Sequence, residues 1–332
     1  MFINLKHNLF IYMLISLLFF IMNSNNILIQ WLLMEFSTII SISLINIKSS
    51  NKIPSLIYFM ISVISGVFLF LMIIMYFSSI NSMKNYEFNF LIQMMFFLKI
   101  GIFPFHYWMI FSYEMMNWSQ IFLMSTLIKF IPIYMLIIMS YINYWSIIYL
   151  LMSNLIISMY TNKFYSLKKM LGCSTIFNSM YFILLLSMNK LLFLIFIIIY
   201  TINYYLLINF LKKNFLNNNN FMFINSFQYY SFLILMFNYS MYPIFLTFII
   251  KWTFIFSMIN NNFFNWMMLI ILISSMIMIW NYFIMLKNSF MKINFYKNNI
   301  LNIKNNNFHY SFMSTMLLMM NMFIFLIMNF FM

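Results

Sequence analysis

Long apolar runs separated by short polar segments form the dominant pattern of this chain. Most runs hold about 20 residues, the length that an α-helix needs to cross a hydrocarbon core about 30 Å thick. The pattern predicts an all-α, polytopic membrane protein with about 11 transmembrane helices in a single transmembrane domain over residues 1–332. The expected helices lie near 8–22, 27–46, 55–78, 88–112, 119–140, 143–160, 168–188, 190–211, 228–258, 263–286 and 311–331.

Composition supports this class. The chain is 65% hydrophobic and only 6% charged, whereas a soluble domain carries about 25% charged residues. A formal charge of +14 would suggest a nucleic-acid partner in a soluble protein. Here the lysines fall mostly between apolar runs, which favours topology charges and contacts with phospholipid headgroups, cardiolipin among them. We expect no nucleic-acid partner.

The lysines between the runs are distributed unequally. Segments on the side of the N-terminus hold twelve of them, and the opposite segments hold only Lys84 and Lys190. Since positive charge collects on the inner side, the N-terminus is expected inside and the C-terminus outside. The twelve are Lys6, Lys48, Lys52, Lys163, Lys168, Lys169, Lys212, Lys213, Lys287, Lys292, Lys297 and Lys304.

Residue usage indicates a mitochondrial gene. The chain has no Ala, Arg or Asp, three Gly and 38 Met. The abundant residues are those of A+T-rich codons, and the methionine excess fits a code that reads ATA as Met. We therefore expect the inner mitochondrial membrane, with the N-terminus in the matrix and the C-terminus in the intermembrane space.

Several kinds of site are not expected in this chain. A single cysteine, Cys173, excludes a thiolate iron–sulfur cage. The histidines His7, His106 and His309 have no paired spacing of the kind that haem or metal ligation requires. No glycine-rich phosphate loop occurs. We expect no bound cofactor and no metal here, and because no loop is large enough for a catalytic domain, function must lie within the membrane.

Four ionisable residues lie inside the predicted spans: Glu35, Lys99, Lys129 and Lys251. A charge at the bilayer centre costs about 2.5–3.5 kcal/mol even on lenient insertion scales. One glutamate cannot neutralise three lysines, so some of them must be neutral, hydrated or paired with other subunits. A proton relay is one interpretation. The alternatives are that the lysines extend to the headgroups or that a Glu–Lys pair only fixes helix packing.

Helix-breaking residues accompany these lysines. Gly101 and Pro104 follow Lys99, Pro132 follows Lys129, and Pro243 precedes Lys251. Broken helices at membrane depth line a cavity or are buried in protein, and a pair of interrupted spans, here the fourth and ninth, is typical of transporters with inverted repeats. His106 is a possible proton carrier between Lys99 and Lys129, or it bonds a neighbouring carbonyl.

These residues resemble the NADH dehydrogenase subunit 2 family of mitochondrial respiratory complex I, in order and spacing from about residue 27 to 260. The fourth-helix signature is fairly specific, and the others are informative in series. The similar segments are Trp31-Leu-Leu-Met-Glu35, Lys99-Ile-Gly101 with Pro104-Phe-His106-Tyr-Trp108, Lys129-Phe-Ile-Pro132, and Pro243 through Lys251-Trp252.

The resemblance implies an antiporter-like, proton-translocating subunit of an enzyme, the NADH:ubiquinone oxidoreductase. Glu35 would pair with Lys99, Lys129 would relay protons along the axis, and Lys251 would sit at the exit-side half-channel. Other complex I membrane subunits would be partners, and NADH, FMN, iron–sulfur clusters and ubiquinone would be bound by partner subunits. The chain departs from the family's glycine and proline pattern around Pro243, so that break has its own shape. A stand-alone cation/proton antiporter and a purely structural membrane subunit remain the alternatives.

Overall fold

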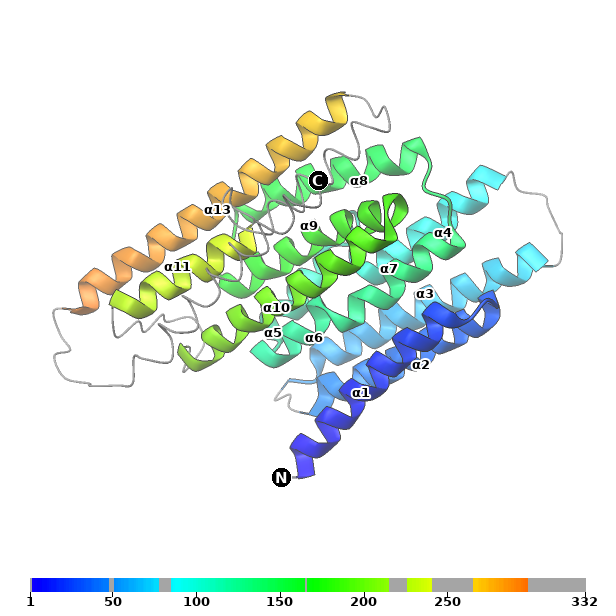
Figure 1. Ribbon diagram of the computed structural model, residues 1–332, viewed down its shortest axis with the longest axis horizontal. Coiled ribbons are helices and arrows are strands. Elements are labelled where there is room, and N and C mark those ends of the chain that lie inside the picture. Colours follow the sequence, from blue (N-terminus) through cyan, green and yellow to red (C-terminus); the bar gives the residue numbers. More distant parts are fainter. Residues whose placement is uncertain are drawn as a thin grey trace. The chain divides into compact units, whose positions relative to one another are not determined.

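The computed structural model describes residues 2–47, 51–77, 85–164, 166–214, 226–240 and 265–297, and its regular structure there is entirely α-helical (Figure 1). Seven stretches in these ranges are long and apolar enough to cross a membrane. The predicted all-α membrane class is therefore confirmed. The helix expected at 311–331 lies outside the described residues, as do Pro243 and Lys251.

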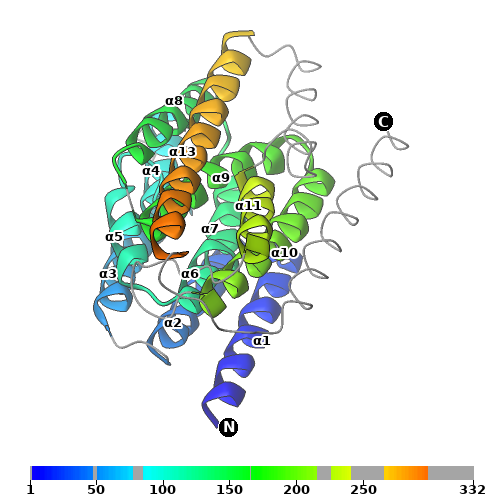
Figure 2. The same cartoon turned by 90° about the vertical axis from the view of Figure 1, so that its left-hand side faces the viewer.

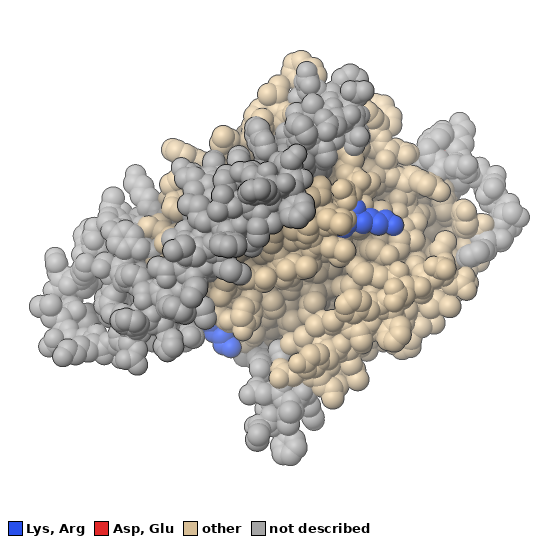
Figure 3. All heavy atoms as spheres, in the orientation of Figure 1, with Lys and Arg blue, Asp and Glu red and all other residues tan. Residues whose placement is uncertain are grey.

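The described surface is largely uncharged. Figure 3 shows one face on which tan atoms cover nearly all of the surface that is not grey. Large apolar side chains are exposed along whole helices, for example Leu56, Met60 and Val67, which are 60%, 61% and 54% exposed. A soluble protein rarely exposes so much contiguous apolar surface, so lipid or other apolar protein must cover it.

The chain divides into two compact units, residues 1–157 with 168–187, and residues 158–167 with 188–332. In the first unit, α2 packs against α1, α3 and α7, and α4 packs against α3 and α7 (Figure 1). Its helices are α1 (Phe2–Asn23), α2 (Ile27–Ile47), α3 (Ile53–Phe77), α4 (Asn85–Ile100), α5 (Tyr107–Met115), α6 (Trp118–Ser125), α7 (Leu127–Met139), most of α8 (Tyr144–Thr161) and nearly all of α9 (Leu167–Met188). The first helix thus begins earlier than the expected residue 8.

The fourth predicted span is broken where the sequence indicated. Gly101 has φ +79°, a left-handed conformation that glycine adopts without strain. The N–H groups of Gly101 and Ile102 both donate to the carbonyl of Phe97, at 2.9 Å, and close the end of α4. A cis peptide bond joins Phe103 to Pro104 before α5 begins. The break beside Lys99 is confirmed.

The fifth predicted span is also interrupted, but not at its proline. Pro132 lies inside α7, and the interruption falls at Thr126, whose φ and ψ are −115° and −96°. A proline inside a helix removes one hydrogen bond and crowds the carbonyl four residues earlier, here that of Ile128. That effect falls two residues after Thr126, inside α7, so it does not account for the interruption. The Thr126 hydroxyl donates to the Phe122 carbonyl at 2.7 Å at this point.

In the second unit, α11 (Ser226–Ser240) packs between α10 (Lys190–Asn214) and α13 (Asn265–Lys297), as Figure 2 shows. Helix α13 corrects one expectation: it continues past the predicted end at residue 286, into the polar stretch that precedes the helix expected at 311–331, and ends at Lys297. No glycine or proline occurs between residues 265 and 297 to end it earlier.

Candidate functional site

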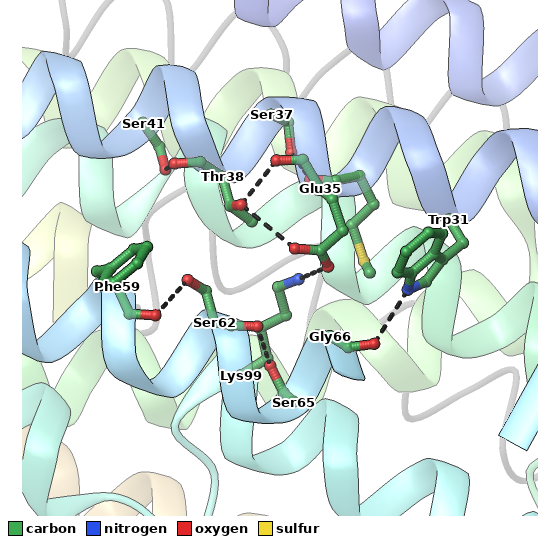
Figure 4. Close-up of polar contacts among 11 residues, drawn as sticks. Trp31, Glu35, Ser37, Thr38, Ser41, Phe59, Ser62, Ser65, Gly66 and Lys99 are labelled. Carbon is green, nitrogen blue, oxygen red and sulfur yellow. Dashed lines mark hydrogen bonds and ion pairs between the residues drawn. The ribbon is translucent and has the colours of Figure 1, made fainter. Parts of the chain in front are cut away.

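Glu35 and Lys99 form an ion pair inside the first unit. Glu35 lies in the middle of α2, and Lys99 lies in the last turn of α4. Lys99 Nζ donates to Glu35 Oε1 at 2.9 Å (Figure 4). The lysine side chain is only 1% exposed and the glutamate side chain is 25% exposed. The lysine is therefore sealed within the bundle, whereas the carboxylate lies partly at the surface of this chain.

Three neighbours shape the surroundings of the Glu35 carboxylate. Thr38, one turn further along α2, places its hydroxyl 3.4 Å from Glu35 Oε2. Gly66 on α3 faces the carboxylate closely enough that a Cβ there would lie 2.7 Å from Oε1. Trp31 donates its indole N–H to the carbonyl of Gly66 at 3.2 Å (Figure 4). Its ring also stacks on that of Phe70. Trp31 therefore holds α3 against α2 where the carboxylate needs room.

The helix break also serves Lys99. A positive charge is favourable at the carboxyl end of a helix, where the backbone carbonyls point outward. Lys99 lies at that end of α4 because Gly101 stops the helix two residues later. Trp108, beyond the break, donates its indole N–H to the carbonyl of Leu98 at 3.1 Å. The break therefore places Lys99 where the dipole of α4 favours a positive charge. It also brings Trp108 to the carbonyl of Leu98.

Lys129, in the first turn of α7, is 3% exposed and bonds to a hydroxyl. Its Nζ donates to Thr175 Oγ1 on α9 at 3.2 Å. Thr175 Oγ1 lies 3.2 Å from the Tyr113 hydroxyl of α5 and 2.8 Å from the carbonyl of Gly172. Among the described residues no carboxylate lies within ion-pair distance of Lys129. A second lysine is thus buried among neutral partners.

The other predicted site residues are placed only in part. His106 lies in the break before α5, is 2% exposed, and its ring contacts Phe103 and Tyr107 at centroid distances of 5.6 and 4.1 Å. Its role as a proton carrier stays a prediction. Lys251 lies outside the described residues. In the described part of the chain, no three His, Cys, Asp or Glu side chains converge as metal ligands would.

Sequence reasoning missed Thr175, Tyr113 and Gly66. A hydroxyl within an apolar span is common, because it bonds a carbonyl of its own helix. Nothing in the local pattern separates Thr175 from the many serines and threonines that do only this. The usable signal was the rarity of glycine, since only three occur in the whole chain.

Comparison with known proteins gives close relatives but no match to any family profile. The chain is 61% identical over 330 residues to NADH-ubiquinone oxidoreductase chain 2 of Apis mellifera ligustica, covering 99% of both chains. The protein of that name from Anopheles gambiae is 28% identical over 204 residues, 60% of each chain.

Solved structures share the fold at low sequence identity. A chain of respiratory complex I from Thermus thermophilus superposes with a TM-score of 0.68 at 12% identity, covering 90% of this chain and 73% of that one. A chain of the Mrp complex from Dietzia sp. DQ12-45-1b gives 0.64 at 12% identity, covering 77% and 55%. A chain of the membrane-bound sulfane sulfur reductase, an archaeal respiratory complex, gives 0.66 at 14% identity, covering 91% and 68%.

Proposed function

Because the chain belongs to the NADH-ubiquinone oxidoreductase chain 2 family, we propose that it translocates protons across the inner mitochondrial membrane through Glu35, Lys99 and Lys129. As a membrane subunit of complex I it is part of an enzyme. Electron transfer from NADH to ubiquinone, with its FMN and iron–sulfur clusters, takes place in partner subunits. This chain uses the energy that they release.

The observation that carries the proposal is the sealed position of Lys99 beside a helix break. Within the described part of the chain its counter-ion is Glu35, at 2.9 Å, and breaking a buried ion pair of this kind costs about 3–5 kcal/mol. A scaffold would gain as much from apolar packing at the same place. Lys129 is also buried, but its Nζ bonds the Thr175 hydroxyl instead of a carboxylate. Lysines that served only topology would extend to the headgroups, and neither does so.

The mechanism follows from the unequal burial of the pair. While Glu35 bonds Lys99, the cation is stabilised and its proton stays. When coupling to the partner subunits draws the carboxylate away, a buried cation without its counter-ion is costly, and transfer of the proton towards a neutral Lys129 is favoured. Helices α4 and α7, which carry the two lysines, pack against each other. Lys251 then continues the path towards the exit side.

Contacts between helix ends agree with the predicted topology, because they join ends that it places on the same side of the membrane. Glu114, at the end of α5, pairs with Lys169, at the start of α9, at 2.9 Å. Gln120 Nε2, at the start of α6, donates to the carbonyl of Ile45, near the end of α2. Both contacts join ends that the lysine distribution predicts to lie on the matrix side.

The test measures protons translocated per electron in vesicles that contain the assembled complex. Glu35→Gln, Lys99→Met and Lys129→Met should each lower this ratio while the complex still assembles on native gels. Lys169→Met, at the half-exposed pair with Glu114, is the matched control and should leave the ratio unchanged.

The alternatives give different results. A purely structural subunit predicts an unchanged ratio in all three variants of the relay residues, and that result would overturn the proposal. A stand-alone cation/proton antiporter predicts sodium-dependent proton flux from the isolated chain in vesicles without the other subunits.

A further inference from the structure

The two oxygens of the Glu35 carboxylate have different neighbours. Oε1 accepts the hydrogen bond from Lys99 Nζ at 2.9 Å, whereas Oε2 lies 3.4 Å from the hydroxyl oxygen of Thr38. A hydroxyl that donates fully to a carboxylate does so at about 2.5–2.7 Å, so Oε2 lies less than about 1 Å from a full bond to Thr38. The carboxylate therefore has one complete partner and one partner close by.

Thr38 is able to complete that bond at no loss to its own helix. Its hydroxyl donates to the backbone carbonyl of Glu35 at 2.7 Å. Glu35 lies in the middle of α2, where each carbonyl also accepts the N–H group four residues further on. When the Thr38 hydroxyl turns from the carbonyl to Oε2, no backbone group is left unpaired.

More hydroxyls follow Thr38 along the interface between α2 and α3. These consecutive helices pack against each other in opposite directions, so Ser62 of α3, one turn before the glycine that faces Glu35, comes opposite Thr38 (Figure 4). One turn further, Ser41 of α2 and Tyr58 of α3 form a side-chain hydrogen bond. All four side chains belong to buried residues. A buried row of hydroxyls thus begins beside the carboxylate.

We propose that Thr38 and Ser62 form an open position for the Glu35 carboxylate, which it occupies when its bond to Lys99 breaks. The inference rests on the proposed function and identifies where the carboxylate moves. In the open position its oxygens accept hydrogen bonds from the two hydroxyls, the carboxylate stays ionised, and no proton is transferred. A carboxylate drawn from its cation without such donors would itself be costly. Thr38 and Ser62 are therefore positioning residues of a two-state element.

A purely structural role makes different demands on these hydroxyls. Serines and threonines in membrane helices commonly bond a carbonyl of their own helix, and Ser62 bonds that of Phe59 at 2.8 Å. If this were their whole role, the loss of a hydroxyl would affect stability equally with and without Lys99. The open position predicts that the hydroxyls matter most when Lys99 is absent, because the carboxylate then has no other partner in this part of the chain.

The experiment compares matched variants of the assembled complex in vesicles. Thr38→Val removes the hydroxyl at nearly constant volume, Thr38→Ser keeps it, and Ser62→Ala removes the second donor. Ser37→Ala is the control, because Ser37 is also buried on α2 and bonds the carbonyl of Met34 at 2.6 Å. Each variant is made with Lys99 and with Lys99→Met. Assembly, protons per electron, coupled turnover and the midpoint of thermal inactivation are measured.

With Lys99 present, Thr38→Val should slow coupled turnover about tenfold, since one hydrogen bond to a charged group changes the ratio of open to closed states by at least about that factor. Ser62→Ala should slow it less. Thr38→Ser and Ser37→Ala should resemble the unaltered complex. In the Lys99→Met complex, Thr38→Val should lower the midpoint of thermal inactivation more than it does beside Lys99, because effects of interacting residues are not additive.

Two results would overturn the open position: unchanged turnover in Thr38→Val, or an equal loss of midpoint with and without Lys99. The proposed function would survive either result if Lys99→Met alone still lowers protons per electron. If Lys99→Met pumps normally, the proposed function falls, and the open position with it.

Discussion

Gly66 leaves the space that the carboxylate of Glu35 occupies. A Cβ built on Gly66 would lie 2.7 Å from Glu35 Oε1 and 2.9 Å from Glu35 Cδ, and Oε1 is the atom that accepts the bond from Lys99. The close approach of α3 to α2 is held by Trp31, whose indole N–H donates to the Gly66 carbonyl. The position of the acceptor atom therefore depends on the absence of a side chain at residue 66.

Gly66→Ala is predicted to lower proton translocation without unfolding the chain. Alanine in the middle of α3 is favoured over glycine by about 1 kcal/mol of helix propensity, so the helix itself should become more stable. The added methyl group displaces the carboxylate and lengthens the bond to Lys99. Protons per electron in vesicles should fall, while the amount of assembled complex stays the same.

Val67→Ala is the matched control, because Val67 is the next residue on α3 and its side chain is 54% exposed. It should leave both measurements unchanged. Unaltered pumping in Gly66→Ala would show that the carboxylate tolerates displacement, and that the geometry of the ion pair does not limit transport.

The two partners of the ion pair are predicted to differ in their effect on stability. Lys99 is 1% exposed and Glu35 is 25% exposed. Glu35→Gln leaves a sealed cation without a counter-ion, which approaches the cost of about 3–5 kcal/mol for breaking a buried pair. Lys99→Met leaves a carboxylate that keeps the Thr38 hydroxyl 3.4 Å from Oε2, so it should cost less. Thermal inactivation of the purified complex measures the difference.

The double variant Glu35→Gln/Lys99→Met tests this explanation. With no buried charge remaining, it should be more stable than Glu35→Gln alone, although it pumps no better. Equal losses in the two single variants would mean that the Thr38 hydroxyl does not offset the loss of the counter-ion.

The sequence indicated the charged part of this site but not its neutral part. Glu35 and Lys99 are conspicuous because charges are rare in apolar runs, and the break after Lys99 follows from the backbone requirements of Gly101 and Pro104. Thr175 carries no such signal, since its link to Lys129 depends on how α7 and α9 pack. Contacts between distant helices are not encoded in any local pattern of residues.

Helix ends were predictable only where a residue imposes them. Asn189 separates α9 from α10, and its side-chain oxygen accepts the N–H of Leu191 at 3.0 Å as a helix cap. Pro132, by contrast, lies within α7, and the interruption falls six residues earlier, at Thr126. The polar stretch after residue 286 was expected to end a helix, but polarity alone does not stop one.

Gly101→Ala is predicted to destabilise the break, because its φ of +79° is costly for a residue with a Cβ. The left-handed conformation costs about 1–2 kcal/mol for such a residue, and asparagine tolerates it better. A Cβ would also lie 2.8 Å from Met109 Sδ. Since Gly101→Asn adds the same Cβ, the difference between the two variants isolates the backbone strain.

Thermal inactivation of the complex should therefore rank the glycine form as most stable, the asparagine form next and the alanine form last. Identical midpoints for Gly101→Asn and Gly101→Ala would assign the whole effect to the contact with Met109. The conformation of the break would then have no energetic role.

Lys168 and Lys169 are adjacent, yet Lys168→Met is predicted to loosen the end of α5 more than Lys169→Met does. Lys168 Nζ donates to the carbonyl of Met116 at 2.9 Å and lies 5.5 Å from the centre of the Trp118 ring. A hydrogen bond from a charged group contributes about 1.5–3 kcal/mol. Lys169 pairs with a 40% exposed Glu114, and exposed pairs contribute about 0–1 kcal/mol.

Hydrogen exchange of the amides at residues 112–118 reports local opening at this helix end, and it should accelerate mainly in Lys168→Met. Raising the salt concentration of the unaltered complex should mimic Lys169→Met, because salt screens exposed charges. Faster exchange in Lys169→Met than in Lys168→Met would show that the ion pair, and not the carbonyl contact, holds α5 against α9.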